Sequence, residues 1–336
     1  MKHIYWFLAI GIIAFVGACK HAPKTTLQKK IVAYIYAGRT DVIPDPTVIT
    51  HLNYAFGKVN AAFNGVEIMH PDYLTRIVEL KQKAPHLKVM LSIGGWTSGG
   101  FSEMASDSTT RLSFAQDCQR IVLQYGLDGI DMDWEYPTNS EAGIASSPHD
   151  TKNFTLLMHN IRDAIGSQKL LTLASVASAQ FVDFRSIMDV VDFVNIMTYD
   201  VARPPHHHSG LHRSEHTGKI CDDEAVQAHV DSGVPIHRLT LGIPFYGHGI
   251  GKIPDFIDYK DIIRLHGYER KWDSVAQVPY LVDSAGTFAC AYDDAQSIAA
   301  KCDYIMANNL GGAMYWEYSC DDAEGTLRNA VYKHLQ

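Results

Sequence analysis

Four acidic residues fall within eight positions in the stretch Asp128-Gly129-Ile130-Asp131-Met132-Asp133-Trp134-Glu135-Tyr136-Pro137. The apolar residues between them predict a buried strand that ends at the proline. Side chains alternate faces along a strand, so Asp131, Asp133 and Glu135 point the same way, about 7 Å apart. Asp128 has the opposite parity and is interpreted as structural. A row of like charges costs free energy, so we interpret it as a functional site rather than an exposed acidic edge strand.

Short apolar runs recur after Ile31, and segments with a helical pattern separate several of them. Alternating strands and helices predict a parallel sheet, and eight such units in 336 residues fit an α/β fold of the (β/α)8 TIM barrel type. A doubly wound open sheet is the alternative, but its glycine-rich phosphate turn is missing after the first run. The predicted strands are 31–36, 51–56, 88–93, 129–135, 170–175, 193–199, 239–243 and 312–316. The predicted helices are 73–84, 109–125, 151–165, 222–232, 293–308 and 322–334.

Aromatic residues stand at most of the predicted strand ends, which form the active-site face of a TIM barrel. Any single one of them is better explained by the hydrophobic core. Together, and beside a row of carboxylates, they describe a cleft that stacks on sugar rings and binds their hydroxyls. The residues are Tyr34, Tyr36, Phe56, Trp96, Tyr199, Tyr246 and Trp316.

The connection from Gly247 to Phe288 is longer than ordinary loops. Its aromatic residues, among them Tyr259 and Trp272, give it enough apolar mass for a small subdomain, 247–288. We expect this insertion between the seventh strand and the next helix to form one wall of the cleft. The catalytic barrel as a whole is predicted to span residues 31–336.

The first residues predict export. A short basic start precedes an apolar run, 4–16, that is typical of a secretory signal and too short for a stable transmembrane helix. Cys19 follows Val16-Gly17-Ala18 and resembles a bacterial lipobox, with a chance cysteine after an ordinary signal peptide as the alternative. We therefore expect 1–18 to be a lipoprotein-type signal peptide and 19–30 a tether. The protein would be an exported bacterial lipoprotein, anchored through Cys19 on the periplasmic side or at the cell surface.

Composition argues against two other classes of function. The net charge of −8, without a basic cluster, argues against a nucleic-acid surface. Besides Cys19 the chain has five cysteines, so at least one thiol stays free unless it pairs between chains, and their spacing matches no metal site. The run His206-His207-His208, with His212 and His216 nearby, is interpreted as a solvated loop, so no metal or cofactor is expected.

Five motifs together resemble glycoside hydrolase family 18, the chitinase family, over nearly the whole chain after Ile31. The acidic stretch Asp128-x-x-Asp131-x-Asp133-x-Glu135 is similar to the catalytic signature of that family at each acidic position. Each short motif is weak alone, but five in order on the predicted strands are specific. The other four are Ser92-Ile93-Gly94-Gly95 and the segments 197–200, 242–247 and 311–316.

The resemblance implies a retaining hydrolysis in which the 2-acetamido group of the substrate is the nucleophile. Glu135 would then be the general acid and base, and Asp133 would hold the acetamido N–H. Asp131 would share a proton with Asp133, and Tyr199 would hydrogen-bond the acetamido oxygen. A general acid needs a raised pKa, and the carboxylate row supplies negative charge for it. The resemblance assigns substrate binding to Tyr34, Phe56, Gly95, Trp96, Met197, Asp200, Tyr246 and Trp316.

The sequence departs from the family pattern at His248, where an arginine often follows Tyr-Gly. The insertion is also shorter than that of deep-cleft members. We expect β-1,4 cleavage of chitin, chitooligosaccharides or other glycans that contain N-acetylglucosamine. The alternatives are an endo-β-N-acetylglucosaminidase acting on N-glycan cores, which Trp134 argues against, and a non-catalytic chitin-binding lectin, which Glu135 argues against.

Overall fold

Eight parallel strands form a closed barrel in the computed structural model, which describes residues 1–3 and 28–336. Around the barrel the strands are β1 (Lys30–Tyr36), β14 (Gly312–Trp316), β8 (Leu239–Pro244), β7 (Phe193–Met197), β6 (Leu170–Val176), β5 (Gly129–Asp133), β4 (Lys88–Gly94) and β2 (His51–Val59). Pairing of β1 with β2 closes the ring, and the short strand β3 (Val66–Ile68) adds to β2 in the antiparallel sense. The predicted TIM barrel is confirmed, and the open doubly wound sheet is wrong.

β5 carries the acidic stretch and lies between β4 and β6. It ends at Asp133, two residues earlier than predicted, because its pairing with β4 stops at that residue. Glu135 therefore belongs to the loop at the barrel mouth rather than to the strand. Asp128 precedes β5 at the opposite end, where it pairs with Lys81 at 2.7 Å and accepts the Val89 N–H at 2.9 Å.

Helices follow most of the barrel strands on the outside of the barrel. They are α1 (Pro71–Glu79), α2 (Phe101–Ser106), α3 (Ser108–Tyr125), α4 (Asp150–Ile165), α5 (Asp222–Asp231), α7 (Ala295–Ala307) and α8 (Thr326–Leu335). Two connections, β1 to β2 and β6 to β7, carry single 3-10 turns at Pro46–Val48 and Phe184–Ser186 instead. α3 shows why the boundaries lie where they do, because the Asp107 carboxylate accepts two N–H groups of its first turn and Gly126, with φ of 66°, ends it.

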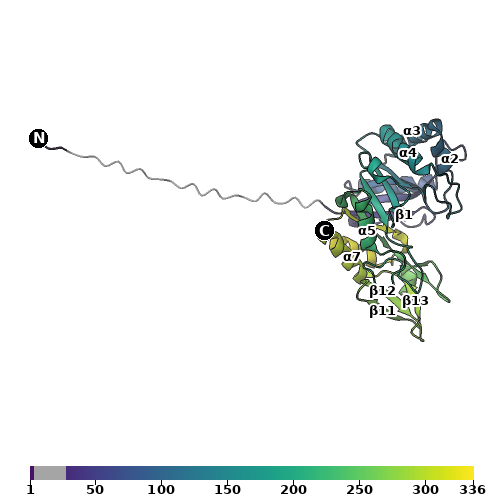
Figure 1. Ribbon diagram of the computed structural model, residues 1–336, viewed down its shortest axis with the longest axis vertical. Coiled ribbons are helices and arrows are strands. Elements are labelled where there is room, and N and C mark those ends of the chain that lie inside the picture. The colour runs from purple at the N-terminus through teal and green to yellow at the C-terminus, as the bar shows by residue number, and fades with distance from the viewer. Residues whose placement is uncertain (4–27) are drawn as a thin grey trace.

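The segment between β8 and α7 forms a second, antiparallel sheet. Its strands are β10 (Ile257–Asp258), β9 (Tyr246–Gly249), β13 (Phe288–Ala291), β12 (Val278–Val282) and β11 (Glu269–Asp273), in that order, with a single helical turn, α6 (Tyr259–Ile262), after β10. In Figure 1 this sheet lies at the end of the molecule opposite α2, α3 and α4. Because β9 starts two residues after β8, it brings Tyr246 and His248 to the barrel mouth.

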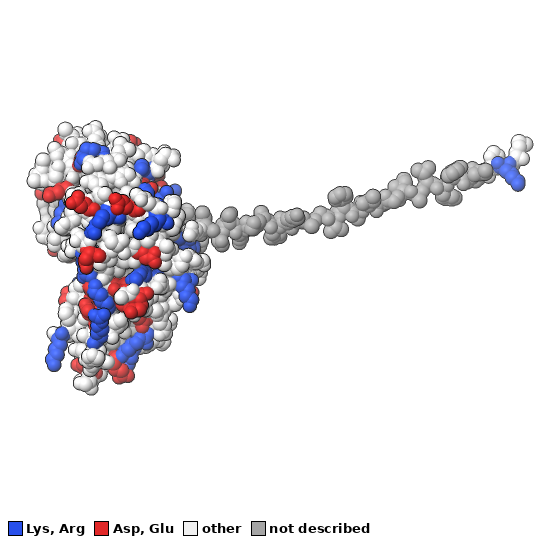
Figure 2. Space-filling model, turned by 180° about the vertical axis from the view of Figure 1, so that it is seen from behind, with Lys and Arg blue, Asp and Glu red and all other residues white. Residues whose placement is uncertain are grey.

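The surface charges are mixed in sign, and the cysteines are unpaired in the described part of the chain. Acidic and basic side chains are interspersed over the face seen in Figure 2. Among the described residues the five cysteines after Cys19 are all free and buried. Within that same part of the chain no helix has the length and hydropathy needed to cross a membrane. Cys19 lies outside the described residues, as do most of the predicted signal peptide and tether.

Candidate active site

Asp131 lies deepest in the site and is fully buried. The hydroxyl groups of Tyr34 and Ser92 donate to its Oδ2 at 2.7 and 2.8 Å. Thr172 Oγ1 and Asn195 Nδ2 donate to its Oδ1 at 2.5 and 3.2 Å. Burial raises the pKa of Asp131, and these hydrogen bonds act against that rise. Both carboxylate oxygens are thus occupied by neutral donors, which hold the side chain in place.

Asp133, two residues further along the same strand face, has a different environment. Its side chain is buried, and its Oδ1 has no hydrogen-bond partner among the described residues. Burial, together with the charges of Glu135 and Asp131, raises the pKa of Asp133 well above its usual range. No hydrogen bond joins the two aspartates in the described part of the chain, so their sharing of a proton stays a prediction. Asp133 therefore offers an unused buried acceptor at the barrel mouth.

Glu135 follows Asp133 at the barrel mouth and is partly buried. Burial raises the pKa of its carboxyl group to about 7, the Tyr136 hydroxyl lowers it, and the negative charge of Asp200 raises it. At neutral pH a substantial fraction of Glu135 is therefore protonated, whereas an ordinary glutamate is ionised. A carboxylic acid with this pKa can donate a proton to a leaving group and take one back afterwards.

Aromatic rings form one wall of the site. Trp316, at the end of β14, stacks on Phe56 with ring centroids 5.5 Å apart and also contacts Tyr34 at 5.9 Å. Gly95 is needed here, because a Cβ on it would lie 2.7 Å from the Phe56 ring and its φ of +92° is strained for other residues. Trp96 is 54% exposed, so its ring is available to a ligand.

Gly94 explains why the motif has two glycines in succession. A Cβ on Gly94 would lie 2.0 Å from the carbonyl oxygen of Asp133, and the N–H of Gly95 donates to that same oxygen at 2.9 Å. The close approach of the two backbones sets where β5 leaves the sheet. A side chain on Gly94 would therefore displace the acidic row.

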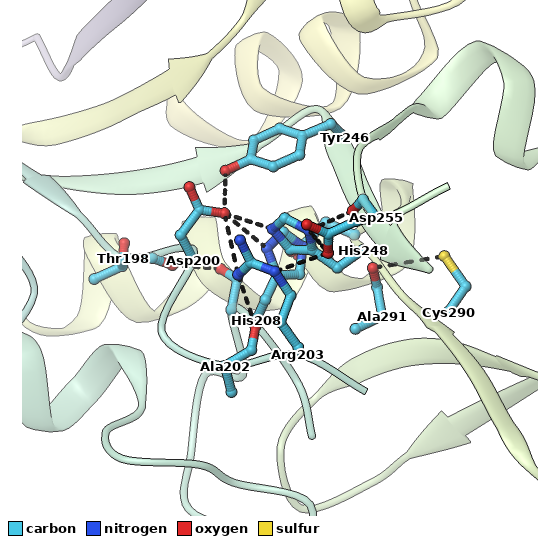
Figure 3. Close-up of polar contacts among 12 residues, drawn as sticks. Thr198, Asp200, Ala202, Arg203, His208, Tyr246, His248, Asp255, Cys290 and Ala291 are labelled. Atoms are coloured by element: carbon cyan, nitrogen blue, oxygen red, sulfur yellow. Dashed lines mark hydrogen bonds and ion pairs between the residues drawn. The ribbon is translucent and has the colours of Figure 1, made fainter. Parts of the chain in front are cut away.

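The motif after β7 brings Tyr199 and Asp200 to the same face. Tyr199 is buried, and its ring meets Tyr246 edge to face at 6.2 Å. The Tyr246 hydroxyl donates to Asp200 Oδ1 at 2.7 Å, as Figure 3 shows. Met197, the last residue of β7, is partly buried. Tyr199 and Asp200, which follow β7, therefore meet Tyr246 of β9.

Asp200 is also bonded to His248, the residue that departs from the family pattern. His248 Nε2 lies 2.6 Å from Asp200 Oδ1, and its Nδ1 lies 2.5 Å from the carbonyl oxygen of Asp255 (Figure 3). Burial raises the pKa of Asp200, but the neighbouring His208 and His248 imidazoles outweigh it and hold the pKa well below its usual range. Asp200 is thus an anion at neutral pH.

Sequence reasoning missed several side chains of this site. Thr172 and Asn195 hold Asp131, yet each sits inside an apolar run that was interpreted only as a strand. A lone polar residue on the inward face of a barrel strand is the signal that could have identified them. His207 and His208 were assigned to a solvated loop, but both are buried, with His208 beside Asp200, because the chain folds back from β7 toward β9. That interpretation is wrong for both residues.

We expect the activity of this site to fall on the alkaline side of about pH 7, because Glu135 must be protonated to act as an acid and its pKa is about 7. Asp200→Asn removes a negative charge that raises this pKa, so the alkaline limb of kcat/KM should move to lower pH. The pH profile of kcat/KM measures it, with Asp163→Asn, an exposed aspartate on α4, as the control. A limb that stays in place or moves to higher pH in Asp200→Asn would contradict the assignment.

A parallel barrel whose mouth holds a row of buried carboxylates beside an aromatic wall is the architecture of a barrel glycoside hydrolase. The chain belongs to glycosyl hydrolases family 18, whose sequence profile matches residues 30–321. This confirms the resemblance drawn from the five motifs.

Known relatives agree with this placement. Chitinase A1 of Niallia circulans is 35% identical over 88% of this chain, which spans about half (48%) of that protein. Chitinase B of Serratia marcescens is 26% identical over 88% of this chain and 80% of that protein. A solved family 18 N-acetylglucosaminidase from Paenibacillus barengoltzii is 33% identical and superposes with a TM-score of 0.83, covering 91% of this chain and 99% of that one.

Proposed function

We propose that this chain is a chitinase-type glycoside hydrolase that cleaves β-1,4 linkages of chitin or chitooligosaccharides with retention. The observation that carries the mechanism is Asp133 Oδ1, which is buried beside Glu135 and has no hydrogen-bond partner among the described residues. A buried acceptor without a donor costs free energy, and the acetamido N–H of a bound sugar would satisfy it. Asp131 cannot replace the acetamido group as the nucleophile, because four hydrogen bonds occupy the Asp131 oxygens.

The roles follow from this arrangement. Glu135 protonates the leaving glycosidic oxygen while the carbonyl oxygen of the substrate's own acetamido group attacks C1. Asp133 holds the acetamido N–H and balances the positive charge of the oxazolinium ring that forms. Glu135, now ionised, then takes a proton from the water that opens the ring. Trp316 lies under the reacting sugar, with Tyr199 and Tyr246 beside it.

Release of single N-acetylglucosamine units is the second candidate. It is favoured by the Paenibacillus barengoltzii structure, which is titled an N-acetylglucosaminidase and which this chain matches over nearly its full length. The other two alternatives have less support. The curated relatives compared above are named chitinases, and Glu135, the acid that a lectin does not need, is present with its raised pKa.

Product analysis tests the proposal. Mass spectrometry of digests should show cleavage of chitooligosaccharides of two to six sugars, with the product lengths separating internal cleavage from release of single units. Cellooligosaccharides of equal length lack the 2-acetamido group, and their rate should be at least ~1,000-fold lower because the nucleophile is missing. Comparable cleavage of both series would rule out substrate assistance, and cleavage of high-mannose glycopeptides alone would move the function to N-glycan cores.

We also propose that the protein is exported and held on a membrane through a lipid on Cys19. The support is the sequence alone: a basic start, an apolar run and Val16-Gly17-Ala18 before the cysteine. In a bacterial host the protein should label with radioactive palmitate and sediment with membranes, while Cys19→Ser should lose the label. Equal labelling of both forms, or none of either, would contradict the anchor.

A further inference from the structure

We propose that Asp200, His208 and His248 form an inhibitory binding site for one divalent transition-metal ion of the zinc class. One ring nitrogen of His208, one ring nitrogen of His248 and one Asp200 oxygen all lie within 4.8 Å of one another. Two imidazole nitrogens and one carboxylate are a ligand set that zinc accepts, with a fourth position left for water. The three residues come from the connection after β7 and from β9, so only the fold brings them together.

The partners of the two ring nitrogens of His248 suit a metal ligand. Its Nδ1 faces two oxygens of Asp255, the carbonyl at 2.5 Å and the carboxylate at 3.1 Å. A proton on Nδ1 can be donated to either oxygen, and a bound metal ion would displace the proton through which Nε2 contacts Asp200 (Figure 3). Metal-binding histidines typically donate their other ring N–H to a carboxylate or a carbonyl in this way.

His208 supplies the independent observation. Its side chain is 1% exposed, and neither ring nitrogen has a hydrogen-bond partner among the described residues. Nδ1 faces Asp200 Oδ1 at 3.9 Å, beyond hydrogen-bond reach, and the His208 ring meets the His248 ring edge to face at 4.7 Å. A buried imidazole with both nitrogens unpartnered is costly, and a metal bond to Nδ1 would offset that cost.

The ligand atoms must move slightly to reach the separations that a zinc ion requires, and the Asp200 side chain can make this movement. Donors on a tetrahedral zinc ion lie ~3.3 Å apart for bonds of about 2.0–2.1 Å. The present separations from Asp200 Oδ1 are 2.6 Å to His248 and 3.9 Å to His208, one shorter and one longer than this. The Asp200 side chain is 50% exposed, so a small rotation can equalise them. Arg203, 3.9 Å from the same oxygen, opposes a cation there, but it is 46% exposed and already paired with Asp255.

The two histidines are held in place by the fold. Ser209, next to His208, donates through its hydroxyl to the Thr198 carbonyl at 2.6 Å, and buried Lys301 donates to the Ser209 carbonyl at 2.8 Å. His248 lies in β9, which pairs with β13. A bound ion would cancel the charge of Asp200 and draw its carboxylate away from the Tyr246 hydroxyl. Asp200 directly follows Tyr199, so this movement would disturb the substrate-binding residues. On the function proposed above, occupancy therefore lowers turnover.

Titration of tag-free protein with zinc chloride against a chromophoric chelator tests the site. Wild type should bind one ion, and His208→Gln and His248→Gln should each weaken binding at least ~100-fold, since each removes one of three ligands. His206→Gln, exposed in the same run, and His216→Gln, which contacts His207, are matched controls that should bind as wild type does. Circular dichroism checks that each variant is folded.

Turnover of a chitotriose substrate, measured in the same titration and relative to the metal-free rate of each protein, completes the test. It should fall in wild type over the concentration range in which zinc binds, and should resist zinc in His208→Gln and His248→Gln. Binding that survives both substitutions, or that is lost in the controls, would overturn the site. One bound ion that leaves turnover unchanged would overturn its inhibitory role, and the binding readout stands even if the substrate is not cleaved.

Discussion

Glu135→Gln should reduce kcat on a chitotriose-type chromogenic substrate by at least ~1,000-fold, because the amide keeps the shape of the side chain but cannot donate a proton to the leaving oxygen. The pKa of about 7 identifies Glu135 as the acid of the row. Substrate affinity, measured by calorimetry, should stay within a few-fold, since the aromatic wall and Asp133 are unchanged. The loss belongs to the transition state rather than to binding.

Glu141→Gln makes the same chemical change six residues away, at an exposed position, and should leave kcat unaltered. Unchanged turnover in Glu135→Gln would remove this residue from the mechanism. A variant that loses binding together with turnover would show that Glu135 holds the substrate rather than protonates it.

Lys301→Met should lower the free energy of unfolding by about 3–5 kcal/mol, the cost of removing one partner from a buried ion pair. Lys301 is fully buried, and its Nζ lies 3.2 Å from Asp222 and 3.0 Å from Asp293. Without the lysine, two carboxylates remain buried with no counter-ion. Urea denaturation followed by circular dichroism measures the change.

The stability loss in Lys301→Met should also depend on pH. Burial raises the pKa of Asp222 to about 7 although Lys301 lowers it, and loss of Lys301 raises it further. A carboxyl group whose pKa is higher in the folded state than in the unfolded state stabilises the protein less and less as pH rises toward the folded-state pKa. The deficit of Lys301→Met should therefore be larger at pH 8 than at pH 5.

Lys271→Met is the control for this substitution, because the side chains of Lys271 and its partner Glu269 are 42% and 68% exposed. Its effect should stay within about 0.5 kcal/mol. A loss below about 1 kcal/mol in Lys301→Met, or a loss that does not grow with pH, would show that the buried cluster is not held as ion pairs.

Much of the fold was predictable because its signals are local. Alternating apolar runs and helical segments predicted all eight barrel strands, since each run must be buried on both faces of a parallel sheet. The sequence also shows no helical pattern in the two connections that carry only 3-10 turns, which agrees with the structure. Strand ends were less accurate. Glu135 was placed on β5, which ends at Asp133 because its pairing with β4 stops there, where Gly94 lets the two backbones come close.

The sequence by itself determined the acidic row, its parity and the family, because these depend on residue type and spacing along one strand. Only the tertiary structure decided what each carboxylate does, because hydrogen-bond donors and burial come from distant segments. Asp131 acquires four donors from four other strands, Asp133 keeps one oxygen without a partner in the described part of the chain, and Glu135 acquires a pKa of about 7. In the same way His208 and His248, forty residues apart in the chain, meet at Asp200 only because β9 folds back onto the barrel mouth.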